Sequence, residues 1–327
     1  MTREHGQPID PVNSSIMVVD IGADGGVFEL PGLAYRCDVH AFDARPDSCD
    51  TIAKDSNGSA YRSLTVHNHG MAGRPGLRRL YVTKQPQASS LLKPDPNIIQ
   101  RVWREGDGFN VIAEMEIDCI TLSAFCAREG ITRIDHIKID TQGTELEILE
   151  GAADMLSRIS VISSEVEFVP LYQEQPLFED ILGFLRSHSF RFIGFKEIIT
   201  NDGDPNGKKI WGEAVFANTI FDPQSETAMT AGQILMDLGF MADGKWLLAD
   251  CGFTEDVIGK VARDQAAHSG GSLHRLELNL IGRAQALNEQ RRRAGKKPIN
   301  FGLIKSVLTR FKWGQRILGI VSRVRAD

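Results

Sequence analysis

The chain has 327 residues, of which 42% are hydrophobic and 24% are charged. These are ordinary values for a globular protein, and the length suits one large domain or a domain with an appendage. The five cysteines are scattered and form no CxxC pair, which argues against a disulfide framework or a structural zinc site and favours a reducing compartment.

The charge is divided unevenly along the chain. Residues 290–326 hold eleven Lys or Arg and no acid, whereas residues 1–289 hold 26 basic and 42 acidic residues. An acidic body argues against binding to nucleic acid. The N-terminal residues lack the apolar segment of a secretory signal, and no apolar run approaches the roughly 18 residues of a membrane span. We therefore expect a cytoplasmic protein.

The first part of the chain alternates strand patterns with helix and loop signals. An apolar run at residues 16–21 leads into a glycine-rich loop, and Pro46 is placed to open a helix after the second strand. An irregular insertion, residues 71–96, contains a strand-like segment and a polar loop. In chain order, the predicted elements are strands 16–21, 39–42, 63–67, 78–83 and 111–120 and a helix at 122–128.

The stretch DHIKIDTQGTELEILEGA (135–152) is the most informative in the sequence. A buried strand at 136–139 ends in Asp140, a tight turn follows, and Thr144 with Glu147 predicts a capping box at the start of a helix. Strand 160–168, helix 178–187 and strands 191–195 and 214–218 come next. This order predicts an α/β fold: a mostly parallel sheet with helices on both faces and an antiparallel end strand.

After Pro223 the pattern contains helices only, near residues 226–238, 254–267, 273–292 and 303–324. We therefore predict one domain at residues 1–222 and an all-helical extension at 223–327. Residues 303–325 form a basic amphipathic pattern without acids. Two interpretations stay open: the helix packs on its neighbours or on a second subunit, or it lies on an anionic membrane surface.

Three acids follow three successive predicted strands of the sheet. Asp20 lies in the loop motif DxG with Gly22, Asp43 ends the second strand, and Asp140 ends the central one. Ligands of open α/β sheets bind at the carboxyl ends of the strands. Asp20 suits an amino group, and Asp43 suits a ribose diol. Each acid alone is as well explained as a cap or a solvated loop residue, but three in register predict a nucleoside site.

These segments resemble the FkbM family of S-adenosylmethionine-dependent methyltransferases. The resemblance rests on VVDIGADGG, AFDARP and IDHIKIDTQGTELEILEGA, with later support from the segment beginning SEVEF and from WGEAVFAN, and it covers residues 16–219. It implies a class I methyltransferase (Rossmann-like) fold, S-adenosylmethionine as cofactor, and O-methylation of a sugar hydroxyl or natural product. The helical extension lies outside the resemblance.

The resemblance also implies roles for individual residues. Asp20 and Gly22 would hold the methionine end of the donor, Asp43 the ribose, and Asp140 the donor near its methyl group. The cofactor-binding residues predicted on this basis are Asp20, Gly22, Ala23, Asp24, Gly25, Asp43, Asn68 and Asp140. Two departures from the family pattern are conservative: Asp24 stands where Asn is common, and Asp43 where Glu is commoner.

An alkoxide nucleophile requires a general base. The candidates lie at strand ends: His67 and His69 after the third strand, Asp140, and Glu165 or Glu167. We predict Asp140, His69 and Glu165 as the catalytic residues, although a histidine in a loop is more often an ordinary surface residue.

A Mg²⁺ site at Asp140, Glu165 and Glu167 is weighed against the weak ligands that follow Asp140, and no metal is predicted. Ser89, Ser90 and Trp103 in the insertion are candidates for a lid that contacts the acceptor, and Trp103 is equally explained as a half-buried anchor of its loop.

The sequence therefore predicts a cytoplasmic S-adenosylmethionine-dependent O-methyltransferase acting on a glycan, a lipid-linked sugar or another polyhydroxylated metabolite. The expected partners are this acceptor and, through the C-terminal helices, either a membrane surface or a second subunit. An alternative is a non-catalytic protein that binds a nucleoside or a partner on the same fold. A nicotinamide-dependent oxidoreductase is disfavoured because GxGxxG is absent.

Overall fold

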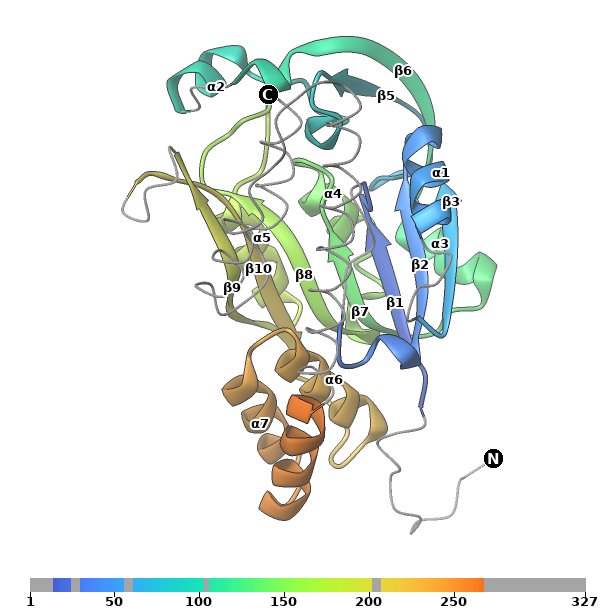
Figure 1. The fold of residues 1–327 in the computed structure, drawn as a ribbon, viewed down its shortest axis with the longest axis vertical. Coiled ribbons are helices and arrows are strands. Elements are labelled where there is room, and N and C mark those ends of the chain that lie inside the picture. Colours follow the sequence, from blue (N-terminus) through green and yellow to red (C-terminus); the bar gives the residue numbers. More distant parts are fainter. Residues whose placement is uncertain (1–13, 25–29, 56–60, 103–105, 202–206, 268–327) are drawn as a thin grey trace, which may run out of the picture. The chain divides into compact units, whose positions relative to one another are not determined.

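The computed structural model describes residues 14–24, 30–55, 61–102, 106–201 and 207–267 (Figure 1). They belong to a compact unit that extends to Ala266, and the residues after it form a separate unit. The predicted helices at 273–292 and 303–324, and Trp103, therefore lie outside the described residues. Among the described helices, none has the length and apolar character that crossing a bilayer requires.

A seven-stranded sheet forms the centre of this unit, in the order β3-β2-β1-β7-β8-β10-β9. All neighbours pair in parallel except β10, which runs antiparallel to both β8 and β9. The strands are β1 (Ile16–Ile21), β2 (Cys37–Asp43), β3 (Ser63–Asn68), β7 (Ile134–Ile139), β8 (Ile159–Glu167), β9 (Phe190–Thr200) and β10 (Lys209–Asn218). The predicted mostly parallel sheet with an antiparallel strand is confirmed.

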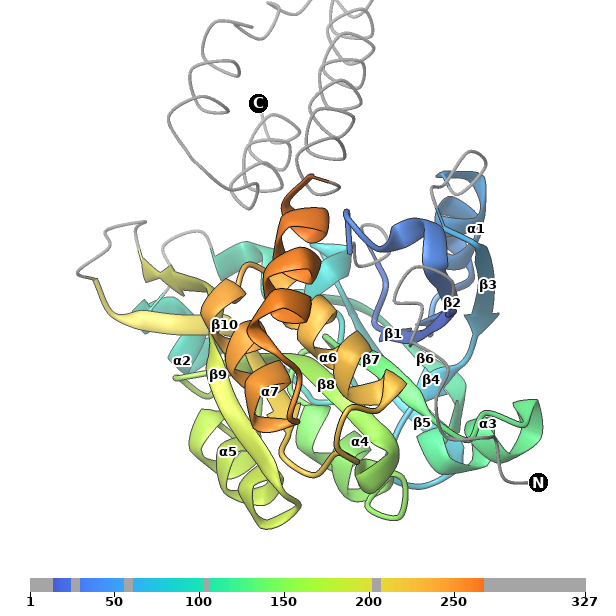
Figure 2. The ribbon, with the colours of Figure 1, turned by 90° about the horizontal axis from the view of Figure 1, so that it is seen from below.

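Helices cover both faces of the sheet (Figure 2). On one face, α3 (Leu122–Glu129), α4 (Glu145–Glu150) and α5 (Phe178–Ser187) pack on Val19, Ile137 and Ile162. On the other, α6 (Glu226–Asp237) and α7 (Met241–Asp250) pack on Val18 and Val161, and α1 (Pro46–Asp55) covers β2 and β3. The inner strands are covered on both faces, as expected for parallel strands. The face toward α6 is apolar at Val18 and Val161 and becomes polar toward the carboxyl ends, at Asp20 and Ser163.

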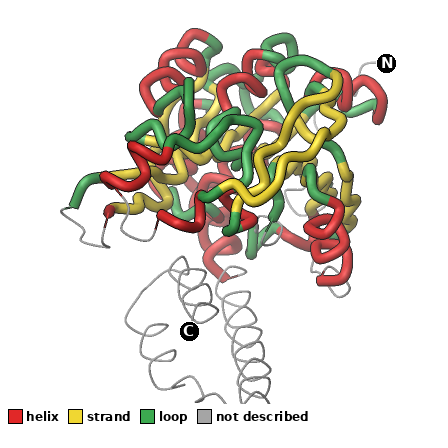
Figure 3. The backbone as a smooth tube through the Cα atoms, turned by 90° about the horizontal axis from the view of Figure 1, so that it is seen from above, coloured by secondary structure: helices red, strands yellow, loops and turns green. Residues whose placement is uncertain are grey.

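The insertion forms a second, three-stranded sheet. Its strands pair in the order β4-β6-β5, with β4 (Gly70–Met71), β5 (Gly76–Thr83) and β6 (Val111–Ile120), and α2 (Pro96–Val102) lies between β5 and β6 in the chain. Figure 1 shows these elements above the carboxyl ends of the parallel strands, and Figure 3, which looks onto that end, shows β5 and β6 crossing in front of the central sheet.

Two features of the helical prediction differ from the structure. The predicted domain boundary after residue 222 lies inside the compact unit, because the apolar face of α6 covers the sheet: Ala231, Ile234 and Leu235 are fully buried against it. The change from mixed to purely helical patterns therefore does not mark the end of the core. The sequence also gave no expectation for α2 or α7.

Candidate functional site

The carboxyl ends of β1, β2 and β7 are joined by backbone hydrogen bonds. The N–H groups of Gly22 and Ala23 both donate to the carbonyl of Phe42 at 3.0 Å, and Asp140 N–H donates to the carbonyl of Ile21 at 2.9 Å. Gly22 has φ +81°, and a Cβ there would lie 1.8 Å from the carbonyl oxygen of Asp140. Only glycine therefore permits this close approach of two strand ends.

This junction brings the three predicted acids to one edge of the sheet. Ile21 pairs with Phe42 on one side and with Ile139 on the other, so Asp43 and Asp140 each follow a direct neighbour of Ile21. Asp20 precedes Ile21 and is fully buried. The backbone register therefore places Asp20, Asp43 and Asp140 on three neighbouring strand ends, and their role in binding a ligand stays a prediction.

The loop after β1 is fastened to the start of α1. Asp24 Oδ2 accepts a hydrogen bond from Arg45 Nη2 at 2.9 Å, and its Oδ1 accepts one from Ser48 Oγ at 3.1 Å. Asp43 Oδ1 accepts the backbone N–H of Arg45 at 2.8 Å. Burial raises the pKa of Asp43, and the N–H of Arg45 opposes this effect. Asp24 thus holds the loop beside Asp43, and Gly25 lies outside the described residues.

The candidates after β3 have other partners. Asn68 Nδ2 donates to the carbonyls of Asp43 and Ala44, at 3.2 Å each, so its amide braces the turn after β2. His69 is 35% exposed, and its Nδ1 lies 4.0 Å from Asp118 Oδ2 on β6. The contacts described for these two side chains therefore join them to the β2 turn and the small sheet.

His67 lies on the edge strand β3 and packs on the face of the sheet that α3 covers. Its ring stacks on Phe42 with centroids 4.6 Å apart and meets Phe125 of α3 at 5.1 Å. Its Nε2 lies 2.9 Å from His40 Nδ1. Burial and the neighbouring His40 lower the pKa of His67 to about 4. These contacts make His67 part of an aromatic cluster on the α3 face.

The turn after β7 holds several polar groups in place. Gln142 has φ +61°, a conformation uncommon for a residue other than glycine. Its Nε2 donates to Asp140 Oδ1 at 3.0 Å and also to Glu165 Oε1 of β8. Its backbone carbonyl accepts Ser90 Oγ at 2.8 Å.

The predicted capping box of Thr144 and Glu147 is wrong. Thr144 makes no side-chain cap, and Glu147 Oε1 pairs with Arg78 Nη1 of β5 at 2.7 Å. The side chain that closes the turn is Glu145, which is 1% exposed. Its Oε1 accepts the backbone N–H of Thr141 at 2.7 Å, and its Oε2 accepts that of Gly143 at 2.9 Å. Glu145 rather than Glu147 accepts the free N–H groups of the turn, because its side chain reaches back into the turn, whereas that of Glu147 points toward the small sheet.

Glu165 and Glu167 share one face of β8, as the alternation of the strand predicts. Glu167 is 1% exposed, whereas part of Glu165 remains accessible. Burial raises the pKa of Glu165 well above its usual range, and the charges of Asp140, Glu167 and Glu145 add to this effect. The pKa of Glu167 is raised well above its usual range for the same reason. A carboxyl with a raised pKa suits a general base.

Two lysines balance part of this negative charge. Lys138 Nζ lies 3.0 Å from Asp140 Oδ2. Burial acts to lower the pKa of Lys138, but Asp140, Asp20 and Glu213 outweigh it, and the pKa is raised. Lys196 Nζ lies 2.9 Å from Glu213 Oε1. The carboxyl ends of β1, β7 and β8, together with Glu213 of the antiparallel β10 beside them, therefore carry more acids than cations, which suits a cationic ligand.

The insertion is attached to this cluster through Tyr172, whose side chain is 1% exposed. Its hydroxyl donates to the carbonyl of Ala88 at 2.8 Å and lies 3.0 Å from Gln142 Oε1, so one hydrogen serves two carbonyl oxygens. Of the predicted lid residues, Ser90 contacts Gln142, and Ser89 Oγ accepts the N–H of Thr83 at 3.1 Å. Ser90 is thus next to the cluster and Ser89 within the insertion.

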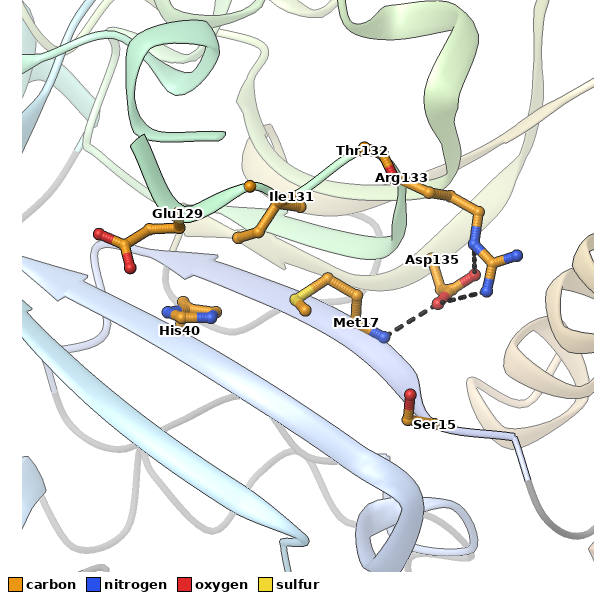
Figure 4. A pocket seen from close by; sticks show the side chains of 9 residues that line it. Ser15, Met17, His40, Glu129, Ile131, Thr132, Arg133 and Asp135 are labelled. Carbon is orange, nitrogen blue, oxygen red and sulfur yellow. Dashed lines mark hydrogen bonds and ion pairs between the residues drawn. The ribbon is translucent and has the colours of Figure 1, made fainter. Parts of the chain in front are cut away.

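A separate hollow of about 490 Å³ lies at the amino ends of β1 and β7 (Figure 4). Met17, His40, Glu129 and Arg133 line it. Arg133 Nε lies 3.0 Å from Asp135 Oδ1, so its guanidinium is already paired. This hollow contains none of the predicted site residues, because those lie at the opposite ends of the same strands.

Several residues of the site are not evident from the sequence. Gln142, Glu145, Tyr172 and Lys138 carry much of its hydrogen bonding. Their signals were local: Gln142 lies between Asp140 and a glycine in the turn, and Lys138 lies two residues before Asp140 on a buried strand. No group of three or more His, Cys, Asp or Glu in the described ranges is arranged to hold a metal ion.

The strand order, with β10 antiparallel between β8 and β9, and the acids at the strand ends define a class I methyltransferase fold. The model of the FkbM methyltransferase domain family matches residues 20–192, which is more than half of the chain. The protein belongs to this family. No curated protein matches its sequence.

Solved structures with a related chain trace share little sequence with this protein. Magnesium protoporphyrin IX methyltransferase from Synechocystis PCC 6803, with bound SAM, has a TM-score of 0.35 at 10% identity, over 63% of this chain and 71% of that one. An rRNA methylase from Streptococcus thermophilus has a TM-score of 0.29 at 11% identity, over 63% and 89%. An uncharacterized protein from Listeria monocytogenes serotype 4b has a TM-score of 0.32 at 11% identity, over 80% and 96%.

Proposed function

We propose that this protein is an S-adenosylmethionine-dependent O-methyltransferase whose acceptor is a sugar or another polyhydroxylated compound. The observation that carries the proposal is the convergence of Asp20, Asp43 and Asp140 at one junction of three strands. S-adenosylmethionine supplies an activated methyl group on a sulfonium. Its ammonium group, ribose diol and positive sulfur match three carboxylates better than they match a neutral or basic pocket.

In this proposal, the three strand-end acids bind the methyl donor. Asp43, fixed by the Arg45 N–H, binds the ribose diol of the donor. Asp20 is fully buried, and its negative charge attracts the ammonium group of the donor. Asp140 has one oxygen bonded to Lys138 and the other to Gln142, so it is held still beside the donor. Fixed placement of the reacting atoms supplies much of the rate in such a transfer.

Glu165 is the general base of this proposal. It is partly exposed beside Asp140, and its pKa, raised by burial and by the neighbouring carboxylates, makes its ionised form a stronger base toward the proton of an acceptor hydroxyl. The hydroxyl oxygen then forms the bond to the methyl carbon as the carbon–sulfur bond breaks, and Glu165 keeps the proton. His69, predicted from the sequence as catalytic, lies beside Asp118 of the small sheet, and we assign it to the border of the acceptor site.

The choice of a hydroxyl acceptor follows from the side chains at the open side of the cluster. Carboxylates accept hydrogen bonds from O–H groups, and Glu165 is linked through Gln142 to Ser90 of the insertion. Ser90 is fixed there by its bond to the Gln142 carbonyl. Several acceptors spaced over a short distance favour a ligand with more than one hydroxyl.

Transfer of a labelled methyl group tests this function. The wild-type protein is incubated with methyl-labelled S-adenosylmethionine and a panel of sugars, sugar nucleotides and lipid-linked sugars, and label is followed into the acceptor. We expect O-methylated product, reduced about 100-fold in Glu165→Gln. Glu179→Gln, at an exposed position of α5, is the matched control. Product formed at the wild-type rate by Glu165→Gln would contradict the assignment of the base.

A further inference from the structure

Among the residues that the structure describes, the side chain of Gln142 bonds both the donor-side carboxylate, Asp140, and the acceptor-side carboxylate, Glu165. Its Nε2 carries two hydrogens, and each meets one acceptor: Asp140 Oδ1 at 3.0 Å and Glu165 Oε1. Asp140 directly follows β7, and Glu165 lies on β8. Without a donor between them, two carboxylates at this separation repel each other.

The same residue fixes the insertion. Its carbonyl accepts Ser90 Oγ at 2.8 Å, and its Oε1 lies 3.0 Å from the Tyr172 hydroxyl, which also reaches Ala88. Residues 88–90 are therefore linked to Gln142 in two ways: Ser90 bonds its backbone carbonyl directly, and Ala88 is reached from its side chain through the Tyr172 hydroxyl. The backbone of Gln142 takes φ +61° to make this arrangement, and such conformations persist where the surroundings hold them.

We propose that Gln142 is a positioning residue that sets the spacing of Asp140 and Glu165 and couples this pair to the loop at residues 88–90. This role rests on the proposed function. A neutral amide is required because it donates twice while adding no charge. A carboxylate of the same size would donate nothing and would place a third negative charge between two others.

The charged groups around Glu165 determine how the loss of the Gln142 amide changes the ionisation of Glu165. Donation to a carboxylate stabilises its ionised form, so removing Nε2 disfavours the ionised form of Glu165. A cationic sulfonium binds better beside ionised carboxylates. The titratable groups that face Glu165 are Lys138 and Asp140 on β7, Glu145 on α4, Glu167 on its own strand, Glu213 with its partner Lys196 on β10 and β9, and Tyr172.

Calorimetric titration of S-adenosylmethionine across pH tests the proposal. Gln142→Asn keeps an amide and is compatible with positive φ, but its shorter side chain cannot span both oxygens. Gln142→Met keeps the length and removes both donors. We expect each variant to bind S-adenosylmethionine about tenfold more weakly at pH 7. The pH at which affinity is half maximal should rise relative to wild type.

The matched controls separate positioning from folding. Gln224 also has positive φ, +49°, and its Nε2 donates to the carbonyl of exposed Gly252. Gln224→Asn and Gln224→Met should leave both affinity and its pH profile unchanged. If wild type binds and the Gln142 variants give the wild-type pH profile, Gln142 is only structural and the proposal is overturned. If wild type itself fails to bind, the proposed function falls and this inference with it.

Discussion

Gly22 and Gln142 show how single backbone conformations hold this site. At Gly22, φ is +81° and the place of a side chain is taken by the carbonyl of Asp140. At Gln142, the turn is held by hydrogen bonds from three parts of the chain. The sequence indicated the glycine because a glycine-rich loop followed a strand. It did not show what Gln142 does, because three of its partners, Ser90, Glu165 and Tyr172, are distant in sequence.

Gly22→Ala tests the strand junction. A methyl group 1.8 Å from the Asp140 carbonyl oxygen cannot be accommodated without separating β1 from β7. We expect the free energy of unfolding to fall by about 3 kcal/mol or more, from strain and overpacking together. Chemical denaturation measures it. Gly183→Ala, in α5 with open space around it, should instead stabilise by about 0.5–1 kcal/mol. Equal effects of the two substitutions would refute the close-approach argument.

His67 makes the protein sensitive to acid. Its pKa is lowered from 6.5 to about 4, so the folded state resists the protonation that the unfolded chain accepts. The stability that this contributes is complete above pH 6.5 and is lost as the pH falls toward 4. In His67→Phe, which keeps the aromatic packing, the loss of unfolding free energy between pH 7.5 and 5 should shrink by about 1 kcal/mol, after allowance for partial exposure. An unchanged loss would show that acid sensitivity arises elsewhere.

At the scale of elements, local patterns predicted the sheet well and the ends of elements less well. Helix α5 has the predicted bounds, and β1 and β6 do too. The helix does start after Thr144, as predicted, but the capping box was wrong. The spacing of Thr144 and Glu147 fits such a box, whereas the observed contacts, Glu145 with the turn and Arg78 with Glu147, form in the folded chain. A short local pattern cannot predict which of two acids forms an ion pair with an arginine that is distant in sequence.

Glu145→Gln tests the observed closure of the turn. The amide of glutamine would present a donor to the N–H of Thr141 or Gly143, leaving a buried pair of donors unsatisfied. We expect a loss of about 2–3 kcal/mol in unfolding free energy and weaker binding of S-adenosylmethionine. Glu147→Gln weakens a partly exposed ion pair with Arg78 and should cost at most about 1 kcal/mol. If the two variants are equally stable, Glu145 does not close the turn.

At the scale of the whole molecule, the class of fold predicted from the sequence is confirmed, and the assignment of the ligand site to the carboxyl ends of the strands stays a prediction. The boundary of the core was not predictable in the same way. Helices α6 and α7 look like an extension in the sequence, yet their apolar faces complete the core that β1 and β8 begin. That residues 226–266 belong with the sheet is seen only from the packing of their apolar side chains against its strands.

The compact unit ends at Ala266, which leads to a prediction about the chain after it. A protein ending at Ala267 should unfold at the same temperature as the sheet domain does within the full-length protein. It should also bind S-adenosylmethionine with the affinity of the full chain. We propose that the basic segment 290–326 contacts anionic lipid. Full-length protein should then co-sediment with phosphatidylserine vesicles, and the shorter protein should not. Equal sedimentation, together with a change in oligomeric state, would assign the segment to subunit contact instead.

The most direct test of this account is calorimetric titration of S-adenosylmethionine and S-adenosylhomocysteine into wild type, Asp43→Ala and the surface control Asp50→Ala. We expect micromolar binding, about −8 kcal/mol, in wild type and in the control, and at least a tenfold loss in Asp43→Ala. Absence of binding by wild type at millimolar ligand would contradict the assignment of the three strand-end acids to a donor site and would favour a protein that binds a partner on this fold.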